Sequence, residues 1–378
     1  MAETAVKAPA GLLGGRRVSD PWVLMCALLL VGIGLVMVYS ASSALALKRT
    51  GDAAFFFKAH LVRVLLGLAV MVLLAGYDYL RLRRWTYPLL GLVFLALLLV
   101  LIPGVGHTAG GATRWLRLAG VSLQPSELAK LALVIYLAYY LSKHQDQVKT
   151  FSRGMLPPLG VAMLMVAPVL LEPDLGISIT LVVLAMGMLF VAGARLVHLA
   201  LLAAAGVPVL YLLLSRGYWL DRMLSFLSPW KDPSDTGFQI IHSFLAFGSG
   251  GVMGAGLGAS KQKLFYLPEP HTDFIFSVLG EELGLWGVLL VLAIFMVLVW
   301  RGLKIALEAG DLFGSYLALG CTLIVGLQAF VNAGVVMGLL PTKGLTLPFI
   351  SYGGSSLITN FACVGILLSV AGHSGRRP

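Results

Sequence analysis

The stretch Pro268-Glu-Pro-His-Thr-Asp273 joins a long polar connection to the apolar run that follows it, and the rest of the chain is arranged around this junction. The connection, residues 215–273, is the only long segment outside the apolar runs. Its last residue, Asp273, is a carboxylate at the point where a loop meets the bilayer. Because such a group can meet a substrate that is half lipid and half polar, Asp273 is the predicted reaction centre.

The composition indicates an integral membrane protein. Of the 378 residues, 59% are hydrophobic and 12% are charged, and the mean hydropathy is +0.93. A soluble domain of this size is far less apolar. The first apolar run, from Trp22 to about Ala44, exceeds a signal-peptide core of roughly 7 to 15 residues, so we expect it to remain as a membrane span. Cys26, Cys321 and Cys363 lack the paired spacing of a disulfide framework or a zinc site.

Apolar runs of roughly 17 to 25 residues predict an all-α polytopic membrane protein with about ten transmembrane helices. The chain is expected to form one domain, 1–378, with a large extracytoplasmic loop, 215–273, between the seventh and eighth helices. Residues 1–21 and 372–378 are the expected cytoplasmic tails. The predicted helices span approximately 22–44, 59–76, 85–102, 126–142, 155–171, 176–194, 196–214, 274–300, 313–338 and 355–371.

Lys and Arg in the short connections predict the orientation. With the N-terminus inside, the inner segments carry fourteen of these residues and the short outer connections carry six. Both termini are therefore expected in the cytoplasm and residues 215–273 outside. The net charge of +10 does not indicate a nucleic-acid partner, because the cations flank helices where anionic headgroups lie. The long loop itself contains five basic and five acidic residues.

The long loop contains two recognisable segments. Phe238, Ile241, Phe244 and Leu245 fall on one face of a short helix, which is expected to lie in the outer interface with N-cap candidates from Ser234 onward. The glycine-rich residues 248–258 are either a flexible hinge or a cradle of backbone amides for substrate. On the helix after Asp273, a track of small residues is expected to be wide enough for a lipid tail. It consists of Ser277, Gly280 and Gly284.

Several polar residues near the apolar runs have a structural alternative to a functional role. Asp273 is alternatively a helix N-cap, and Ser126 is explained by capping alone. Glu127 and Lys130 are spaced for an ion pair. Glu281 and Glu282 alternatively form a buried structural pair with Arg63 or Lys130. Glu172 and Asp174 lie in a very short outer connection and are expected to bind a cation or an outer-loop Arg. The irregular segment 341–356 is expected to be buried or to line a cavity.

At these residues the chain resembles the SEDS family (shape, elongation, division and sporulation) over nearly its whole length. The segment Gly338-Leu-Leu-Pro-Thr-Lys-Gly-Leu-Thr-Leu-Pro348 looks more like the division branch than the elongation branch, with a sporulation member as the other alternative. Ile177 stands where many relatives have Thr. The blocks that carry the resemblance are Gln124-Pro-Ser-Glu-Leu-Ala-Lys130, Glu172-Pro-Asp-Leu-Gly176, Pro268-Glu-Pro-His-Thr-Asp-Phe-Ile-Phe276 with Glu281-Glu-Leu-Gly284, and Lys343-Gly-Leu-Thr-Leu-Pro-Phe-Ile-Ser-Tyr-Gly-Gly-Ser-Ser356.

The resemblance implies a peptidoglycan glycosyltransferase that polymerises lipid II into glycan strands on the outer face of the bacterial cytoplasmic membrane during septal cell-wall synthesis. Implied partners are lipid II, the growing glycan strand, a class B penicillin-binding transpeptidase and other divisome membrane proteins. Asp273 matches the family's catalytic aspartate. The chemistry fits the residue, because a sugar hydroxyl is a poor nucleophile and needs a base for an inverting attack on the anomeric carbon.

The lipid-pyrophosphate leaving group calls for Lys, Arg or a divalent cation such as Mg²⁺ or Mn²⁺, and the sequence leaves the metal open. Candidate pyrophosphate contacts are Lys343, Lys261, Lys263 and Arg114. Further candidate substrate contacts are His271, Ser351, Glu127, Lys130 and Glu281. The alternatives are a flippase for lipid-linked precursors, which needs access from both faces, and a scaffold that recruits a transpeptidase. The outward clustering of polar residues favours the enzyme.

Overall fold

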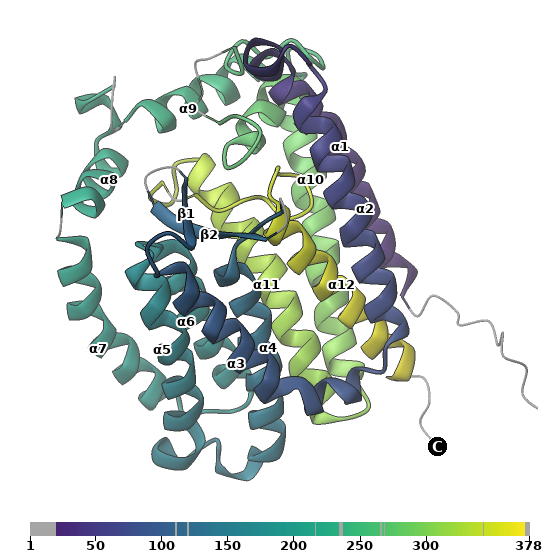
Figure 1. The fold of residues 1–378 in the computed structure, drawn as a ribbon, viewed down its shortest axis with the longest axis vertical. Coiled ribbons are helices and arrows are strands. Elements are labelled where there is room, and N and C mark those ends of the chain that lie inside the picture. Colours follow the sequence, from purple (N-terminus) through teal and green to yellow (C-terminus); the bar gives the residue numbers. More distant parts are fainter. Residues whose placement is uncertain are drawn as a thin grey trace, which may run out of the picture.

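The computed structural model describes residues 20–109, 112–118, 121–215, 217–233, 237–264, 267, 269–342 and 344–374, and it shows a bundle of helices (Figure 1). Long apolar segments form helices in a bilayer because every backbone polar group must be satisfied within the segment. The first helices are α1 (Pro21–Thr50), α2 (Phe55–Gly76), η1 (Tyr79–Arg81), α3 (Leu82–Val100), α4 (Pro125–Lys143), η2 (Gln145–Gln147), η3 (Phe151–Met155), α5 (Leu156–Leu171) and α6 (Leu175–Val191). The later helices are α7 (Leu196–Leu214), α8 (Gly217–Leu227), η4 (Pro229–Lys231), α9 (Phe238–Gly250), α10 (Ile275–Glu308), α11 (Leu312–Val336) and α12 (Gly354–Ser374).

Each predicted membrane segment contains a helix, and the polytopic α-helical fold is confirmed. Within the described residues, eight helices are long and apolar enough to cross a membrane. The two further candidates are α4, which carries the buried charges Glu127 and Lys130, and α6, which has 17 residues. The number of spans therefore stays a prediction. Gly193, with φ of 95°, lies between α6 and α7, so the sixth helix ends shortly before the predicted residue 194.

The helices differ greatly in how far they are buried. Most of α11 and α12 is enclosed by other helices, whereas almost all of α7 is exposed. Figure 1 shows α7 at the left edge, away from α10 and α12, and continuing into α8 and α9. These two helices arch over the end of the bundle where strands β1 and β2 lie. The described part of the loop predicted at 215–273 thus contains the helices α8 and α9 and the short helix η4.

A small sheet corrects the purely helical prediction. The strands β1 (Gly106–Ala109), β2 (Ala112–Leu118) and β3 (Val121–Leu123) form a three-stranded antiparallel sheet in the order β1-β2-β3. A cross-strand pair supports the hairpin, since the hydroxyls of Thr108 and Thr113 lie 2.8 Å apart. The strands are too short to give a clear alternation of polar and apolar residues, which is why the sequence pattern missed them.

The helix α10 is interrupted at Gly284, where φ is 65° and ψ is −162°. The break leaves carbonyl oxygens of the first turns without helical partners, and the glycine-rich segment supplies donors. Ala255 N donates to Glu281 O (2.9 Å) and Gly256 N donates to Glu282 O (3.0 Å). A Cβ at Gly284 would collide with the backbone of the glycine-rich segment. This segment is therefore docked on the break in α10 rather than free to hinge.

The predicted apolar face of α9 is buried in part: Ile241 is buried, Phe238 and Phe244 are half-buried, and Leu245 is exposed. Ile240, Ser243 and Ala246 are buried as well. Polar contacts decide this orientation, because Ser243 Oγ donates to Val336 O (2.5 Å) and lies 2.8 Å from Ser277 Oγ. The N-cap candidate Ser234 lies outside the described residues.

Candidate active site

Asp273 lies in the turn that precedes α10. The helix begins at Ile275, its N-cap is Phe274, and no side chain caps it. The alternative role of Asp273 as an N-cap is therefore wrong. Burial raises the pKa of the Asp273 carboxyl to about 6, and the positive charge of Arg222 opposes this rise. The carboxylate is thus ionised at neutral pH and is basic enough to accept a proton, as a general base must.

Several charged side chains influence Asp273 electrostatically. Arg222 and Arg114 lower its pKa, while Glu269 and Asp174 raise it. These residues come from α8, β2, the turn before α10 and the connection between α5 and α6. The fold therefore brings positive and negative groups from four separate segments to one carboxylate.

The backbone beside Asp273 is fixed by a residue of α11. Asn332 Nδ2 donates to Asp273 O (2.9 Å) and to Leu345 O (2.6 Å). The carboxylate itself faces the segment after α11, since a Cβ at Gly344 would lie 2.9 Å from Asp273 Oδ2. Two distant parts of the chain thus meet at the candidate base.

The segment between α11 and α12 is irregular, and most of residues 345–351 are buried, in line with the prediction for 341–356, whereas Leu339 and Gly344 are exposed. Leu347 N donates to Ser351 Oγ (2.8 Å), so the candidate contact Ser351 shapes this segment. Phe349 adopts a left-handed conformation with φ of 64° and packs 5.5 Å from the ring of Phe361. Lys343 lies outside the described residues, and the preceding Thr342 O accepts from Arg222 Nη1 (3.1 Å). Arg222 therefore connects α8 to this segment.

Arg114 binds the connection between α5 and α6, which confirms the expected Arg partner for the carboxylate of Asp174 but not for that of Glu172. Its Nε donates to Glu172 O (3.1 Å), Nη2 donates to Pro173 O (2.6 Å), and Nη1 lies 3.5 Å from Asp174 Oδ2. Asp174 also caps α6 by accepting from Ile177 N (3.1 Å). Burial raises the pKa of Glu172 to about 8, so its carboxyl group is protonated at neutral pH.

Glu127 and Lys130 form a second polar cluster, inside the bundle. Lys130 Nζ lies 2.8 Å from Glu127 Oε2, which confirms the ion pair, and donates to Gln328 Oε1 (2.9 Å). Gln328 Nε2 in turn donates to Thr346 O (2.9 Å). This cluster links α4 to α11 and to the segment that faces Asp273. The predicted capping role of Ser126 is wrong, because Gln124 is the N-cap position of α4.

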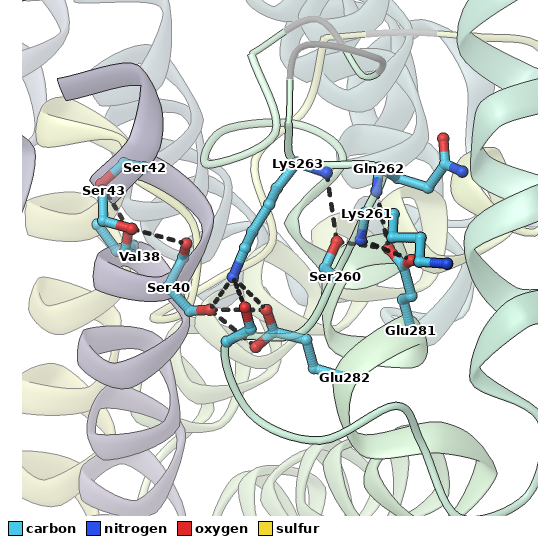
Figure 2. A network of polar contacts seen from close by, with 11 residues as sticks. Val38, Ser40, Ser42, Ser43, Ser260, Lys261, Gln262, Lys263, Glu281 and Glu282 are labelled. Atoms are coloured by element: carbon cyan, nitrogen blue, oxygen red, sulfur yellow. Dashed lines mark hydrogen bonds and ion pairs between the residues drawn. The ribbon is translucent and has the colours of Figure 1, made fainter. Parts of the chain in front are cut away.

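Lys263, Glu281 and Glu282 form a third cluster at the break in α10 (Figure 2). Lys263 Nζ donates to Glu282 Oε1 (2.9 Å), Ser40 Oγ (3.0 Å) and Gly258 O (2.7 Å). A lysine ammonium has three donors, so all of them are used here. The placement favours a structural role for Lys263 over a pyrophosphate contact.

Glu281 does not pair with Arg63 or Lys130, which corrects the structural alternative. Its carboxylate accepts from the hydroxyl of Ser260, from Lys261 N (2.9 Å) and from Gln262 N (3.3 Å). Figure 2 shows these donors converging on the glutamate from one loop. The side chain of Lys261 is exposed. Lys261 therefore stays a candidate for an anionic ligand.

His271 is buried in an aromatic cluster. Its ring lies 4.6 Å from that of Phe56 and 5.3 Å from that of Tyr352, and its carbonyl oxygen accepts from Tyr352 N (2.9 Å). Burial lowers the pKa of His271 to about 4, so the ring is neutral at pH 7. These contacts hold the turn that leads to Asp273 against α2 and the segment before α12.

An apolar cavity of about 340 Å³ adjoins the first turns of α10. Gly280 and Gly284 line it together with Phe244, Phe247 and Val288. Two residues of the predicted small-residue track thus border an open space, while Ser277 is closed off by its contact with α9. The fit of a lipid tail stays a prediction.

Two residues at the site were not predicted from the sequence. Arg222 is one of five basic residues in a loop of balanced charge, and nothing in its local pattern marks it. Asn332 carries a usable signal, because an amide inside an apolar run needs hydrogen-bond partners and is costly without them. Among the described residues, no three His, Cys, Asp or Glu side chains form a group that could hold a metal ion.

Comparisons with known proteins agree with this architecture. Residues 21–376 match the family profile of the FtsW, RodA and SpoVE cell cycle proteins. The chain is 52% identical over 354 residues to the probable peptidoglycan glycosyltransferase FtsW of Geobacter sulfurreducens, covering 93% of this chain and 95% of the relative. It is 45% identical over 356 residues to the stage V sporulation protein E of Bacillus subtilis, covering 94% and 97%.

Solved structures of similar proteins superpose on this chain over most of its length. A chain of a peptidoglycan synthase complex superposes with a TM-score of 0.78 at 30% identity, covering 95% of this chain and 99% of the other. The rod shape determining protein RodA of Thermus thermophilus superposes with a TM-score of 0.69 at 29% identity, covering 95% and 98%. The chain therefore belongs to the FtsW, RodA and SpoVE family of integral membrane cell cycle proteins, the SEDS family that its motifs resemble.

Proposed function

We propose that this protein is a peptidoglycan glycosyltransferase that polymerises lipid II, with Asp273 as the base toward the acceptor 4-hydroxyl. One observation carries the catalytic assignment. The Asp273 carboxylate lies just before α10 and does not cap this helix. Burial raises its pKa to about 6. A base with this pKa is ionised at neutral pH and still accepts the hydroxyl proton as the bond to the anomeric carbon forms. The family relationship to probable peptidoglycan glycosyltransferases supports the reaction class.

The departing lipid pyrophosphate needs positive charge as its negative charge develops. The positive charges of Arg222 and Arg114 both lower the pKa of Asp273. We add Arg222 to the candidate pyrophosphate contacts, beside Arg114, Lys261 and Lys343. A divalent cation such as Mg²⁺ or Mn²⁺ is a further source of charge. Mg²⁺ is commonly held by one or two carboxylates plus substrate phosphates, so such an ion would depend on the pyrophosphate for many of its ligands.

The proposed setting is the bacterial cytoplasmic membrane at the division septum, with both termini in the cytoplasm and the site facing outward. The excess of Lys and Arg in the predicted inner connections supports this orientation. The proposed partners are the growing glycan strand, a class B penicillin-binding transpeptidase and other divisome membrane proteins. The likeness to a chain of a peptidoglycan synthase complex and to FtsW proteins supports this assignment.

The test is glycan-chain formation from purified lipid II by the wild-type protein and by Asp273→Asn. The substitution keeps the size of the side chain but removes the base, so polymerisation is expected to be lost while the protein still inserts and folds. Asp52→Asn is the matched control, because Asp52 is an exposed carboxylate paired with Lys58. Glycan synthesis by well-folded Asp273→Asn at the wild-type rate would contradict the assignment. Translocation of labelled lipid II across proteoliposomes without polymerisation would instead indicate the flippase.

A further inference from the structure

We propose that Asn332 is a positioning residue that sets the Asp273 carboxylate against the segment following α11. The inference rests on the proposed role of Asp273 as the base. Asn332 lies one turn before the end of α11 and is buried. Its amide nitrogen donates to Asp273 O (2.9 Å) and to Leu345 O (2.6 Å). Both donors of one amide are thus used to join two separate backbone segments.

The side-chain amide of Asn332 is only partly satisfied, although it bonds two backbone carbonyl groups. Its Oδ1 is buried and has no hydrogen-bond partner among the described residues. A buried acceptor without a partner is costly. A leucine here would remove the unsatisfied Oδ1, but it would leave the carbonyl oxygens of Asp273 and Leu345 without this donor. The amide therefore supplies a geometric constraint that an apolar residue would not.

The constraint acts on the reacting group. Gly344, adjacent to Leu345, approaches the Asp273 carboxylate so closely that a Cβ there would lie 2.9 Å from Oδ2. By holding Asp273 O and Leu345 O at one amide, Asn332 fixes the distance between the carboxylate and this backbone. A base must lie within hydrogen-bond reach of the hydroxyl it deprotonates, and a misplacement of about 1 Å can cost roughly 100-fold in rate.

The experiment compares Asn332→Leu and Asn332→Ala with the wild-type protein in lipid II polymerisation, separating kcat from KM. The expected result is a fall in kcat of roughly 100-fold with KM for lipid II unchanged, because the base is displaced while the substrate contacts remain. The two variants differ in packing, so a loss of folding in Asn332→Ala leaves Asn332→Leu as the test. Melting temperature and size-exclusion profile establish the folded fraction in each case.

Two further variants make the test specific. Asn360→Leu removes a buried asparagine of α12 whose Nδ2 donates to Ser356 Oγ (3.3 Å), and it is expected to alter stability without the loss in kcat. Gly344→Ala places a methyl group against the Asp273 carboxylate and is expected to lower kcat while leaving Asn332 in place. Wild-type kcat in folded Asn332→Leu would overturn the positioning role, even where Asp273→Asn is inactive. Activity in Asp273→Asn would instead refute the proposed base.

Discussion

Lys263 Nζ lies 2.9 Å from Glu282 Oε1, and this buried pair joins the long loop to α10 (Figure 2). Ser40 of α1 completes the contact, since its hydroxyl donates to both oxygens of Glu282 at 2.7 and 2.8 Å. The pair lies next to the break at Gly284, where the glycine-rich segment is docked. We infer that it holds the loop that leads to Asp273 in place.

The first prediction concerns this pair. Lys263→Met leaves the Glu282 carboxylate buried without its cation and is expected to cost roughly 3 to 5 kcal/mol of stability. The double variant with Glu282→Gln removes the stranded charge and is expected to recover most of the loss. Lys58→Met is the matched control, because its pair with Asp52 is exposed and contributes little. Melting temperatures in detergent measure the effect, and an unchanged value for Lys263→Met would show that the pair is dispensable.

The second prediction concerns the cost of keeping Asp273 ionised. Its pKa is about 6 in the folded protein, above the usual 3.8, so the folded state binds the proton more tightly than the unfolded state. The contribution of the Asp273 carboxyl to the free energy of unfolding is therefore greatest below about pH 4, and it is lost as the pH rises through about 6. Asp273→Asn is expected to raise the melting temperature at pH 8 and to have little effect at pH 4. An equal change at both pH values would rule out the raised pKa as the cause.

The third prediction concerns the pH dependence of polymerisation when a positive or a negative side chain near Asp273 is neutralised. Polymerisation is expected to fall on the acid side with a midpoint near the Asp273 pKa of about 6. Arg222→Gln removes a charge that lowers this pKa, so the midpoint is expected to move to higher pH. Glu269→Gln removes a charge that raises it, so the midpoint is expected to move to lower pH. The second shift is expected to be smaller because the Glu269 side chain is 54% exposed and solvent screens it. Shifts of the same sign in the pH profiles of kcat/KM would argue against Asp273 as the titrating group.

The fourth prediction concerns orientation. The cysteines of the chain, Cys26, Cys321 and Cys363, are buried, so they give little background with a thiol reagent. A cysteine at the exposed position Lys231 is expected to react with an impermeant maleimide from outside the cell. A cysteine at the exposed position Arg84 is expected to react only after the membrane is opened. The reverse pattern would place the proposed chemistry on the cytoplasmic face.

Local patterns in the sequence predicted much of the fold. The apolar runs predict helices because a backbone without water must bond to itself, and each predicted run contains one. The pair Glu127 and Lys130 was predictable for a similar reason, since residues three apart on a helix are neighbours whatever surrounds them. The three-stranded sheet was missed because its strands are too short for a periodic pattern.

The sequence by itself also determined the position of the candidate base, because Asp273 lies between a polar loop and an apolar run. Only the tertiary structure decided what surrounds it. The groups that bond the side chains of Glu281 and Asn332, and the carboxylate that pairs with Lys263, lie at least 13 residues away along the chain, beyond the reach of a local sequence pattern. Packing chooses among those partners, and packing also removes the water that would otherwise keep the pKa of Asp273 low. The position of the base is therefore a property of the sequence, whereas its basicity and its alignment come from the fold.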